Sequence, residues 1–221
     1  ASNGVAIFTS LTYTATADQQ SFTLTADDVD GTGSNLPSVD ANAVTSNVVA
    51  TKLVFQTQPD PLTGLTGTPL DLTVDPVVRA VDNNDVTDTG YVTVITLAEA
   101  NGAGSATLTV TGDEDGSAST VTITPTAGTA TFTGLTITYT NNSATTDETF
   151  NLRALSGSLP TADSSQFTSQ GLPAVTSAAY DAGTGTLTVT GTSIQANAGG
   201  ADIDASAFTI TGESGETYAL N

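Results

Sequence analysis

The chain has 221 residues and 38% hydrophobic residues, which is enough to bury a core as one large domain or two small ones. Its formal net charge of -20 excludes nucleic acid as a partner and disfavours an anionic membrane surface, because both need Lys and Arg and the chain has only three. The absence of His and Cys removes the usual general base and the thiol nucleophile, and the lack of Trp disfavours a glycosidase cleft, so we expect no enzyme.

The first feature along the chain is a repeat. Residues 6–14 (AIFTSLTYT) return as residues 130–138 (ATFTGLTIT). The correspondence continues at Phe22 and Phe150, Leu24 and Leu152, Ala26 and Ala154, Leu36-Pro37 and Leu159-Pro160, and Thr45-Ser46 and Thr168-Ser169. Solenoid units are only about 20 to 50 residues long. The two copies lie about 124 residues apart, so the repeat indicates an array of whole domains.

Both copies of the repeat contain a break in the alternation of apolar residues. In the second copy, Ala130 and Phe132 occupy even positions, and the apolar positions become odd after Gly134. In the first copy the same change occurs at Ser10. A shift of one residue turns every side chain of a strand to the other face unless a bulge or a strand switch absorbs it. We therefore expect the two copies to share backbone geometry at this point.

Period-2 alternation of Thr with Val, Leu, Ile, Phe or Ala recurs along the whole chain, and helical periodicity does not. Such alternation predicts strands with one buried face. Clusters of Asp, Asn and Gly between the strands predict turns, at the spacing of an antiparallel sandwich. The predicted strands are 70–74, 78–80, 106–111, 120–124, 186–190 and 208–211, and the predicted turns are 82–85, 112–116 and 181–185.

These observations divide the chain into three parts. We expect residues 1-50 to be the C-terminal half of one module, residues 51-173 a complete module, and residues 174-221 the first strands of a further, different module. Half a sandwich leaves its core open and its edge strands unpaired. Two completions remain open: neighbouring sequence of a longer protein supplies the missing strands, or one 221-residue unit completes the next in a head-to-tail filament.

The stretch 50–59 (ATKLVFQTQP), followed by 77–82 (VVRAVD) and 130–135 (ATFTGL), resembles bacterial immunoglobulin-like repeats of large secreted surface proteins. The tail, residues 175–191, looks like another repeat type found in similar proteins. The resemblance implies tandem immunoglobulin-like antiparallel sandwiches of Greek-key topology, incomplete at both ends. It also implies a setting in RTX-type adhesins, surface-layer or filament proteins at the bacterial cell surface, which calcium often makes rigid.

Calcium is the candidate ligand, because Asp-rich turns supply the oxygen atoms that it prefers. None of the acidic clusters matches the twelve-residue EF-hand pattern. Asp and Asn are also ordinary turn residues whose side chains bond to the nearby backbone. The candidate ligands are Asp82, Asn83, Asp85 and Asp88 in one cluster, Asp113, Glu114 and Asp115 in a second, and Asp27, Asp28 and Asp30 in a third.

Seven Phe residues recur at strand positions in the chain, among them Phe8, Phe132, Phe150 and Phe167. They could form a stripe that binds a ligand. Their positions on the strands, and their recurrence in both copies of the repeat, favour packing in the core instead.

The expected function is that of a non-enzymatic structural module of a bacterial extracellular protein, which builds a stalk, coat or filament by module stacking or strand complementation. The alternative is an adhesin module that recognises a glycan or another surface through its loops with calcium. The expected partners are neighbouring modules or other copies of the chain. No apolar stretch approaches the 18 residues of a membrane span, so we expect no direct membrane insertion.

Overall fold

The structure is a computed structural model that describes residues 5–27, 37–181, 183–194, 209–211 and 217–219. Strands account for 46% of the chain and the described residues form no helix, which confirms the all-β class. Accordingly, no helix among these residues could cross a membrane.

The strands fall into three groups along the chain, which we call the N-terminal segment (residues 5–49), the central unit (residues 52–170) and the C-terminal hairpin (residues 174–192). The N-terminal segment contains β1 (Ser21–Phe22), β2 (Thr25–Ala26), β3 (Val39–Asp40) and β4 (Val44–Thr45). The central unit contains β5 (Lys52–Thr57), β6 (Thr63–Leu65), β7 (Pro69–Asp71), β8 (Val77–Val81), β9 (Ile95–Ala100), β10 (Ser105–Thr109), β11 (Thr120–Ile123), β12 (Thr129–Thr131), β13 (Thr136–Thr140), β14 (Glu148–Leu155), β15 (Ala162–Asp163) and β16 (Phe167–Gln170). The C-terminal hairpin contains β17 (Ala174–Asp181) and β18 (Thr186–Thr192), and β19 (Thr209–Thr211) pairs with β20 (Thr217–Ala219) further on.

Three sheets build the central unit. Their strand orders are β12-β8-β5, β10-β13-β7 and β11-β9-β14-β16-β6, with β15 beside β14. Every pair in these sheets is antiparallel except β6 and β16, which run parallel. The sequence predicts an antiparallel sandwich and gives no sign of this pair, since the three residues of β6 are too few to carry an alternating pattern.

The core lies between these sheets and takes side chains from all three. Val78 of β8, Leu97 of β9 and Phe132, which follows β12, are fully buried. On β8 the buried residues Val78 and Ala80 alternate with the partly exposed Val77 and Arg79, as the period-2 pattern predicts, and the last residue, Val81, is buried as well. The expectation of core packing for the Phe residues is confirmed at Phe132, Phe150 and Phe167.

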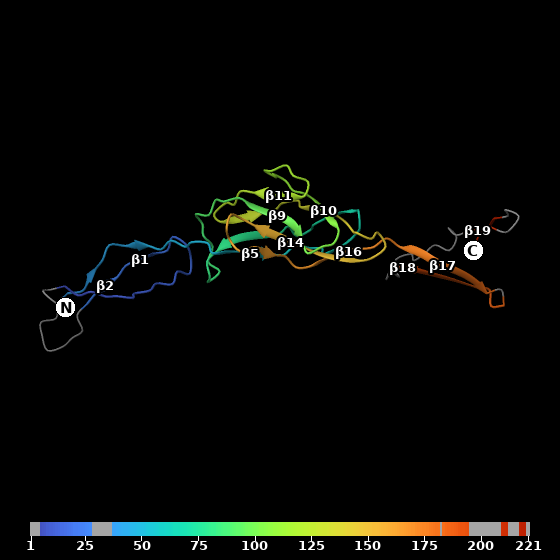
Figure 1. The fold of residues 1–221 in the computed structure, drawn as a ribbon. Coiled ribbons are helices and arrows are strands. Elements are labelled where there is room, and N and C mark those ends of the chain that lie inside the picture. Colours follow the sequence, from blue (N-terminus) through green and yellow to red (C-terminus); the bar gives the residue numbers. More distant parts are fainter. Residues whose placement is uncertain (1–4, 28–36, 182, 195–208, 212–216, 220–221) are drawn as a thin grey trace.

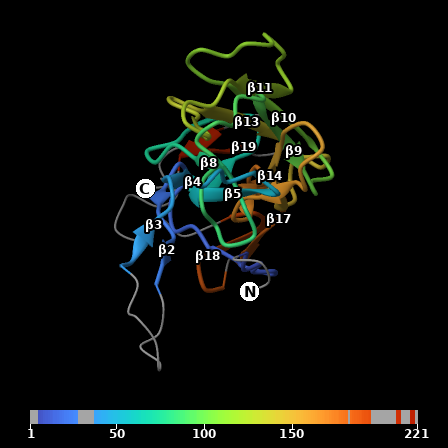
Figure 2. The ribbon, with the colours of Figure 1, turned by 90° about the vertical axis from the view of Figure 1, so that its left-hand side faces the viewer.

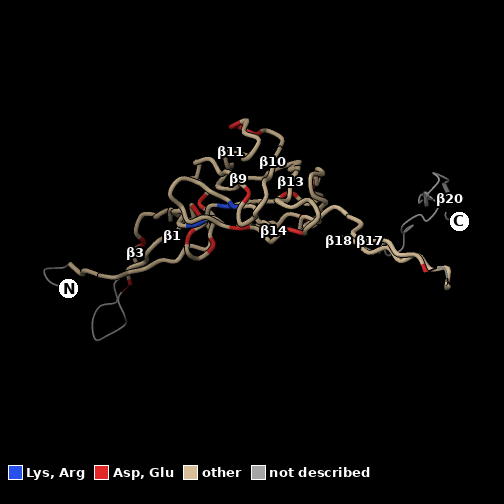
Figure 3. Tube along the Cα trace, turned by 45° about the vertical axis from the view of Figure 1, so that its right-hand side comes forward, with Lys and Arg blue, Asp and Glu red and all other residues tan. Residues whose placement is uncertain are grey.

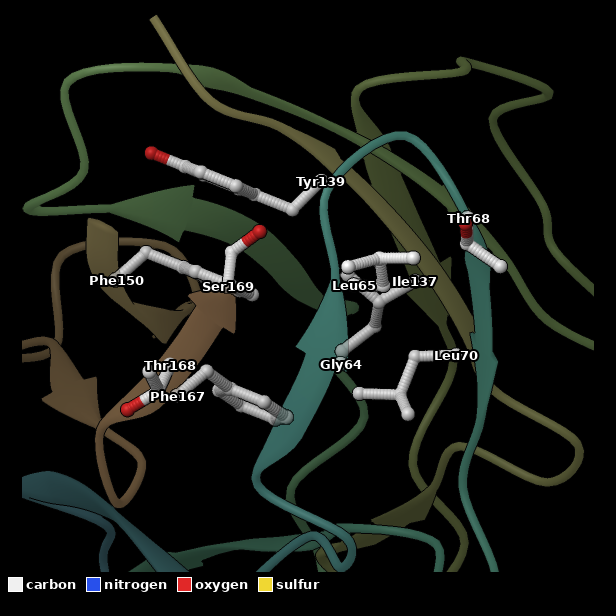
Figure 4. A pocket seen from close by; sticks show the side chains of 10 residues that line it. All are labelled: Gly64, Leu65, Thr68, Leu70, Ile137, Tyr139, Phe150, Phe167, Thr168 and Ser169. Carbon is white, nitrogen blue, oxygen red and sulfur yellow. The ribbon is translucent and has the colours of Figure 1, made fainter. Parts of the chain in front are cut away.

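Aromatic rings fill one end of this core. Phe150 stacks between Tyr139, at 4.2 Å between ring centroids, and Phe167, at 4.9 Å. These rings face the aliphatic side chains of Leu65, Leu70 and Ile137 across a small pocket (Figure 4). Its volume is about 10 Å³, enough for about one water molecule, so this pocket does not admit a small-molecule ligand.

The N-terminal segment reproduces the strand pairing of the central unit residue by residue. Phe22 lies opposite Val44, as Phe150 lies opposite Phe167. Ala26 lies opposite Val39, as Ala154 lies opposite Ala162. A backbone bond from Ala41 N to Leu24 O, 2.8 Å long, has its counterpart between Ser164 N and Leu152 O, also 2.8 Å. The repeat in the sequence is therefore a repeat of register, with 12 residues (27–38) between the paired positions in the first copy and seven (155–161) in the second.

The break in alternation has the same backbone geometry in both copies, as expected. Ser10 has a φ of 63° and Gly134 a φ of 69°, and both values lie in the left-handed region. In the central unit this turn is held by Asp75, whose carboxylate accepts hydrogen bonds from Gly134 N at 3.0 Å and Leu135 N at 3.2 Å. Glycine suits this conformation because it has no Cβ, whereas Ser10 adopts it with a side chain.

The three groups follow one another in space as they do in the sequence. Figure 1 shows the strands β1 and β2 on one side of the central unit and the hairpin of β17 and β18 on the opposite side. In the view turned by 90°, β2 and β3 also lie clear of the central unit (Figure 2). The basic residues Lys52, Arg79 and Arg153 all belong to the central unit, and acidic residues lie on its loops (Figure 3).

Candidate functional site

The N-terminal segment exposes apolar side chains whose repeat partners are buried. Phe8 is 75% exposed, whereas Phe132 is 0% exposed. Leu11 is 67% exposed against 0% for Leu135, and Leu24 is 51% exposed against 0% for Leu152. Single exposed apolar residues are ordinary on protein surfaces, but a contiguous group marks an interaction site. We call the group of Phe8, Leu11, Leu24 and Val39 the open face.

The open face forms a groove rather than a flat surface. The groove has a volume of about 620 Å³ and is lined by the four residues of the open face together with Thr25, Ala26, Asp27, Asp40 and Ala41. Its apolar floor comes from β2, β3 and the preceding stretch that holds Phe8 and Leu11. The expectation of core packing is therefore wrong for Phe8 within this structure, because no described strand covers it.

The central unit shows which strands cover an equivalent face. The buried cluster around Phe132, Leu135 and Leu152 is completed by side chains from the first half of the unit. These are Leu53 of β5, Val78 of β8, Ile95 and Leu97 of β9, and Leu108 of β10. Among the residues that the structure describes, no strands that correspond to β5, β8, β9 and β10 therefore cover the open face.

A single carboxylate joins the N-terminal segment to the central unit. Oδ1 of Asp18 accepts hydrogen bonds from Val48 N at 2.7 Å and Gln19 N at 2.8 Å, and Oδ2 accepts one from Thr89 N at 2.9 Å and one from the Thr89 hydroxyl. The Thr89 hydroxyl is the main cause that lowers the pKa of Asp18 from 3.8 to about 2, with help from the three backbone N–H groups. Asp18 thus links the turn before β1, the linker after β4 and the loop after β8.

The next boundary along the chain has a related contact. The carboxylate of Asp147, just before β14, accepts a hydrogen bond from Gly171 N at 2.8 Å, as Asp18 before β1 does from Val48 N. The hydroxyl of Ser193, after the C-terminal hairpin, donates to Thr145 O at 3.2 Å. In each repeat copy, the loop that precedes β1 or β14 therefore contacts the next part of the chain. The loop before β1 contacts the central unit, and the loop before β14 contacts Ser193 after the C-terminal hairpin.

The predicted calcium cluster at 82–88 lies at the boundary between the N-terminal segment and the central unit, where its side chains bind residues 50–52. Asp88 Oδ2 accepts from Ala50 N at 3.0 Å, and Asn83 Oδ1 accepts from the Thr51 hydroxyl at 3.0 Å. Asp85 Oδ1 lies 2.8 Å from Lys52 Nζ. Asp82 Oδ1 accepts from Asn84 N and Val86 N, each at 2.9 Å, and so shapes the loop itself. Every member of the cluster has a protein partner, and three of them bind consecutive residues of the linker.

The second predicted cluster caps a sheet edge. β11 ends the order β11-β9-β14-β16-β6, so one side of its backbone is open. Asp113 Oδ1 accepts from Thr122 N at 2.9 Å, and Glu114 Oε1 accepts from Thr124 N at 2.7 Å. Asp115 accepts from the hydroxyls of Thr122 and Thr120, and these bonds lower its pKa, Thr122 contributing most. These carboxylates occupy the edge that another strand would otherwise pair with.

The third predicted cluster is only partly described. Asp27 lies at the rim of the groove on the open face. Asp28 and Asp30 lie outside the described residues. Within the described part of the chain, no group of three or more Asp and Glu side chains is placed to hold a metal ion.

Sequence reasoning did not find Asp18, Asp75 or Asp147, although these carboxylates fix the turns and boundaries. Asp18 and Asp75 have no acidic neighbour and Asp147 has only Glu148 beside it, whereas the predicted calcium ligands lie in groups of three or four Asp, Asn and Glu residues. A usable signal for Asp18 and Asp147 was their position shortly before the repeated Phe22 and Phe150.

Two comparisons with known proteins were negative. No protein-family model matches the chain, and a search of curated proteins gives no significant match.

Proposed function

We propose that the chain is a non-enzymatic structural part of a bacterial extracellular surface protein, in which immunoglobulin-like sandwich modules in series build a stalk, coat or filament. The observation that carries this proposal is the repeated register. The pairing of Phe22 with Val44 and of Ala26 with Val39 has its counterpart in the central unit at Phe150 and Ala154. A chain that repeats one fold in series extends reach rather than building a single pocket.

The boundaries between the parts support a serial arrangement. The N-terminal segment and the C-terminal hairpin leave the central unit on opposite sides (Figure 1). Asp18 lies four residues before Phe22 and Asp147 three before Phe150, and each bonds to the linker that leaves its own repeat copy. Recurrent contacts at successive boundaries keep successive modules in a fixed relation, as a stalk or fibre requires.

Composition supports a long assembly that stays soluble, and a sequence resemblance supports an extracellular setting. The net charge of -20 keeps a long assembly soluble by self-repulsion, and the acidic loops of the central unit cap its edges against random pairing. The resemblance of residues 50–59 to repeats of secreted surface proteins agrees with this setting. The proposed partners are neighbouring modules or other copies of the chain, and neither nucleic acid nor insertion into a membrane is part of the function.

Electron microscopy of the native material tests the proposal. Rods, a lattice or a helical filament are expected at the cell surface. A compact soluble particle inside the cell would contradict the proposal.

Calcium is a separate part of the proposal. The cluster of Asp82, Asn83, Asp85 and Asp88 lies at the first boundary, so an ion bound there would stiffen the joint between modules. Isothermal titration of the metal-stripped protein with calcium tests this part. Absence of binding at millimolar or lower calcium would remove calcium from the proposal and leave the structural role in place.

A further inference from the structure

Among the described residues no strands of the first half of a unit cover the open face, and the C-terminal hairpin supplies two strands that can be compared with part of that half. In the central unit, β5 follows the linker after β4 and pairs with β8. Likewise β17 follows β16 and pairs with β18, although β17 and β18 are consecutive whereas β6 and β7 lie between β5 and β8 in the chain. Both pairs are antiparallel, and both have a register shift in the first strand, between Phe55 and Thr57 in β5 and between Val175 and Ser177 in β17.

The pair of β5 and β8 and the pair of β17 and β18 differ in whether another strand pairs with the second strand. β8 is paired on both edges, in the order β12-β8-β5. β18 is paired with β17 on one edge, and no described strand pairs with its other edge. The repeat equivalents of Ala130 to Phe132, which lie in and just after β12, are residues 6–8, and these form no strand within the described chain. Within the described chain, residues 6–8 therefore have no neighbour that corresponds to β8, and β18 has no neighbour that corresponds to β12.

Side chains on the two elements agree with this pairing. Ala6 and Phe8 occupy alternate positions in the sequence, as Ala130 and Phe132 do, and paired as a strand they would lie on one face. On β18, Leu187 and Val189 alternate with more exposed Thr residues and form its apolar face. Pairing of residues 6–8 with β18 would place Phe8 and Val189 in one layer and cover the open face.

The two elements of one chain lie on opposite sides of the central unit, so they do not meet within one molecule (Figure 1). We infer that the free edge of β18 in one copy of the chain pairs with residues 6–8 of a second copy, so that the C-terminal hairpin of the first copy covers the open face of the second. This inference rests on the proposed function and names its partner. The contact joins two different surfaces, so it does not close and produces a linear assembly.

Sedimentation analysis of the purified chain in a dilution series tests the inference. The expected mass rises with concentration from the 22.0 kDa monomer past the dimer. Phe8→Asp is expected to abolish the assembly, because it places a charge on the receiving face. Val92→Asp is the matched control, since Val92 is 71% exposed on the central unit, and this variant is expected to assemble as the wild type does.

A mixing experiment separates a specific contact from a folding defect. Phe8→Asp keeps an intact hairpin, and Val189→Asp keeps an intact open face. Each variant alone is expected to stay monomeric, and an equal mixture is expected to form a complex of two chains and no larger species. Circular dichroism of each variant confirms that the strands are retained.

Three results would overturn the inference: a wild-type chain that is monomeric throughout, assembly that survives Phe8→Asp, or a mixture that forms no complex although both variants are folded. The first would assign the open face to a preceding segment of a longer chain. Filaments in native material together with a monomeric purified chain would refute this pairing and leave the proposed function standing. A purified chain that assembles, together with a compact particle in native material, would refute the function alone.

Discussion

Replacement of Phe132 and of Phe8 by Ala compares one repeat position in two surroundings. Phe132 is 0% exposed and contributes to the core of the central unit, whereas Phe8 is 75% exposed. Phe132→Ala removes a buried ring and leaves a cavity, so it is expected to lower the free energy of unfolding by about 3 to 5 kcal/mol. Phe8→Ala removes a ring that is already in water and is expected to change it by less than about 0.5 kcal/mol.

The measurement is denaturant unfolding followed by circular dichroism, because the chain has no Trp to report by fluorescence. Dilute protein keeps contacts between molecules out of the comparison. For a unit of this size each kcal/mol lowers the midpoint of thermal unfolding by about 4 °C, so Phe132→Ala is expected to lower it by roughly 12 to 20 °C. Equal losses for the two variants would refute the reasoning, since they would mean that Phe8 is buried in the isolated chain.

Further predictions concern the carboxylates that fix turns and boundaries. Asp18→Asn is expected to speed hydrogen exchange at the Thr89 amide by several fold, since the lost charge weakens a contact of about 1 kcal/mol after solvent screening. Because the pKa of Asp18 is lowered from 3.8 to about 2, the same contact is expected to be complete above pH 3.8 and to be lost as the pH falls through 2, and an unchanged Thr89 amide signal over that range in an NMR titration would contradict it. Asp75→Ala is expected to cost about 1 to 3 kcal/mol in denaturant unfolding because Gly134 N and Leu135 N lose their acceptor; a loss below about 0.5 kcal/mol would show that water replaces it.

The alternating pattern in the sequence predicted β7, β8, β10, β11, β18 and β19, and the shared turn, because both depend on local chemistry. Thr alternates with apolar residues where one face of a strand is buried, and Val78 and Ala80 on β8 are buried as that pattern requires. The break at Ser10 and Gly134 was predictable because a change of phase in the alternation has to be absorbed by the backbone, and both residues have a positive φ.

The open face and the pair of β6 and β16 were not predictable in this way. Phe8 and Phe132 have nearly the same neighbours in sequence, so local pattern cannot distinguish an exposed ring from a buried one. The difference depends on whether strands of the β8 and β9 type are present. The parallel pair joins Thr63 to Thr168, residues that are far apart in the chain and without a pattern that links them.

The candidate site was likewise predictable from the sequence only in part. The clusters at 82–88 and 113–115 were correctly placed in turns, but their contacts with residues 50–52 and with β11 come from the fold. Short acidic turns bond wherever donors are near, and the sequence does not say which donors those will be.

The two repeat copies have connections of different length on either side of their first paired strand, and the connection after that strand differs most. The connection between Ala26 and Val39 has 12 residues where that between Ala154 and Ala162 has seven, yet the pairing on either side is the same. Closing the longer loop costs only about 0.5 kcal/mol more, by the logarithmic dependence of loop entropy on length. Insertions at this tip therefore leave the scaffold unchanged, and evolution can vary the surface of one repeat here without altering its neighbours. In this chain the longer connection carries Asp27, Asp28 and Asp30, whereas residues 155–161 carry no acidic residue, so the two copies differ in charge at this tip.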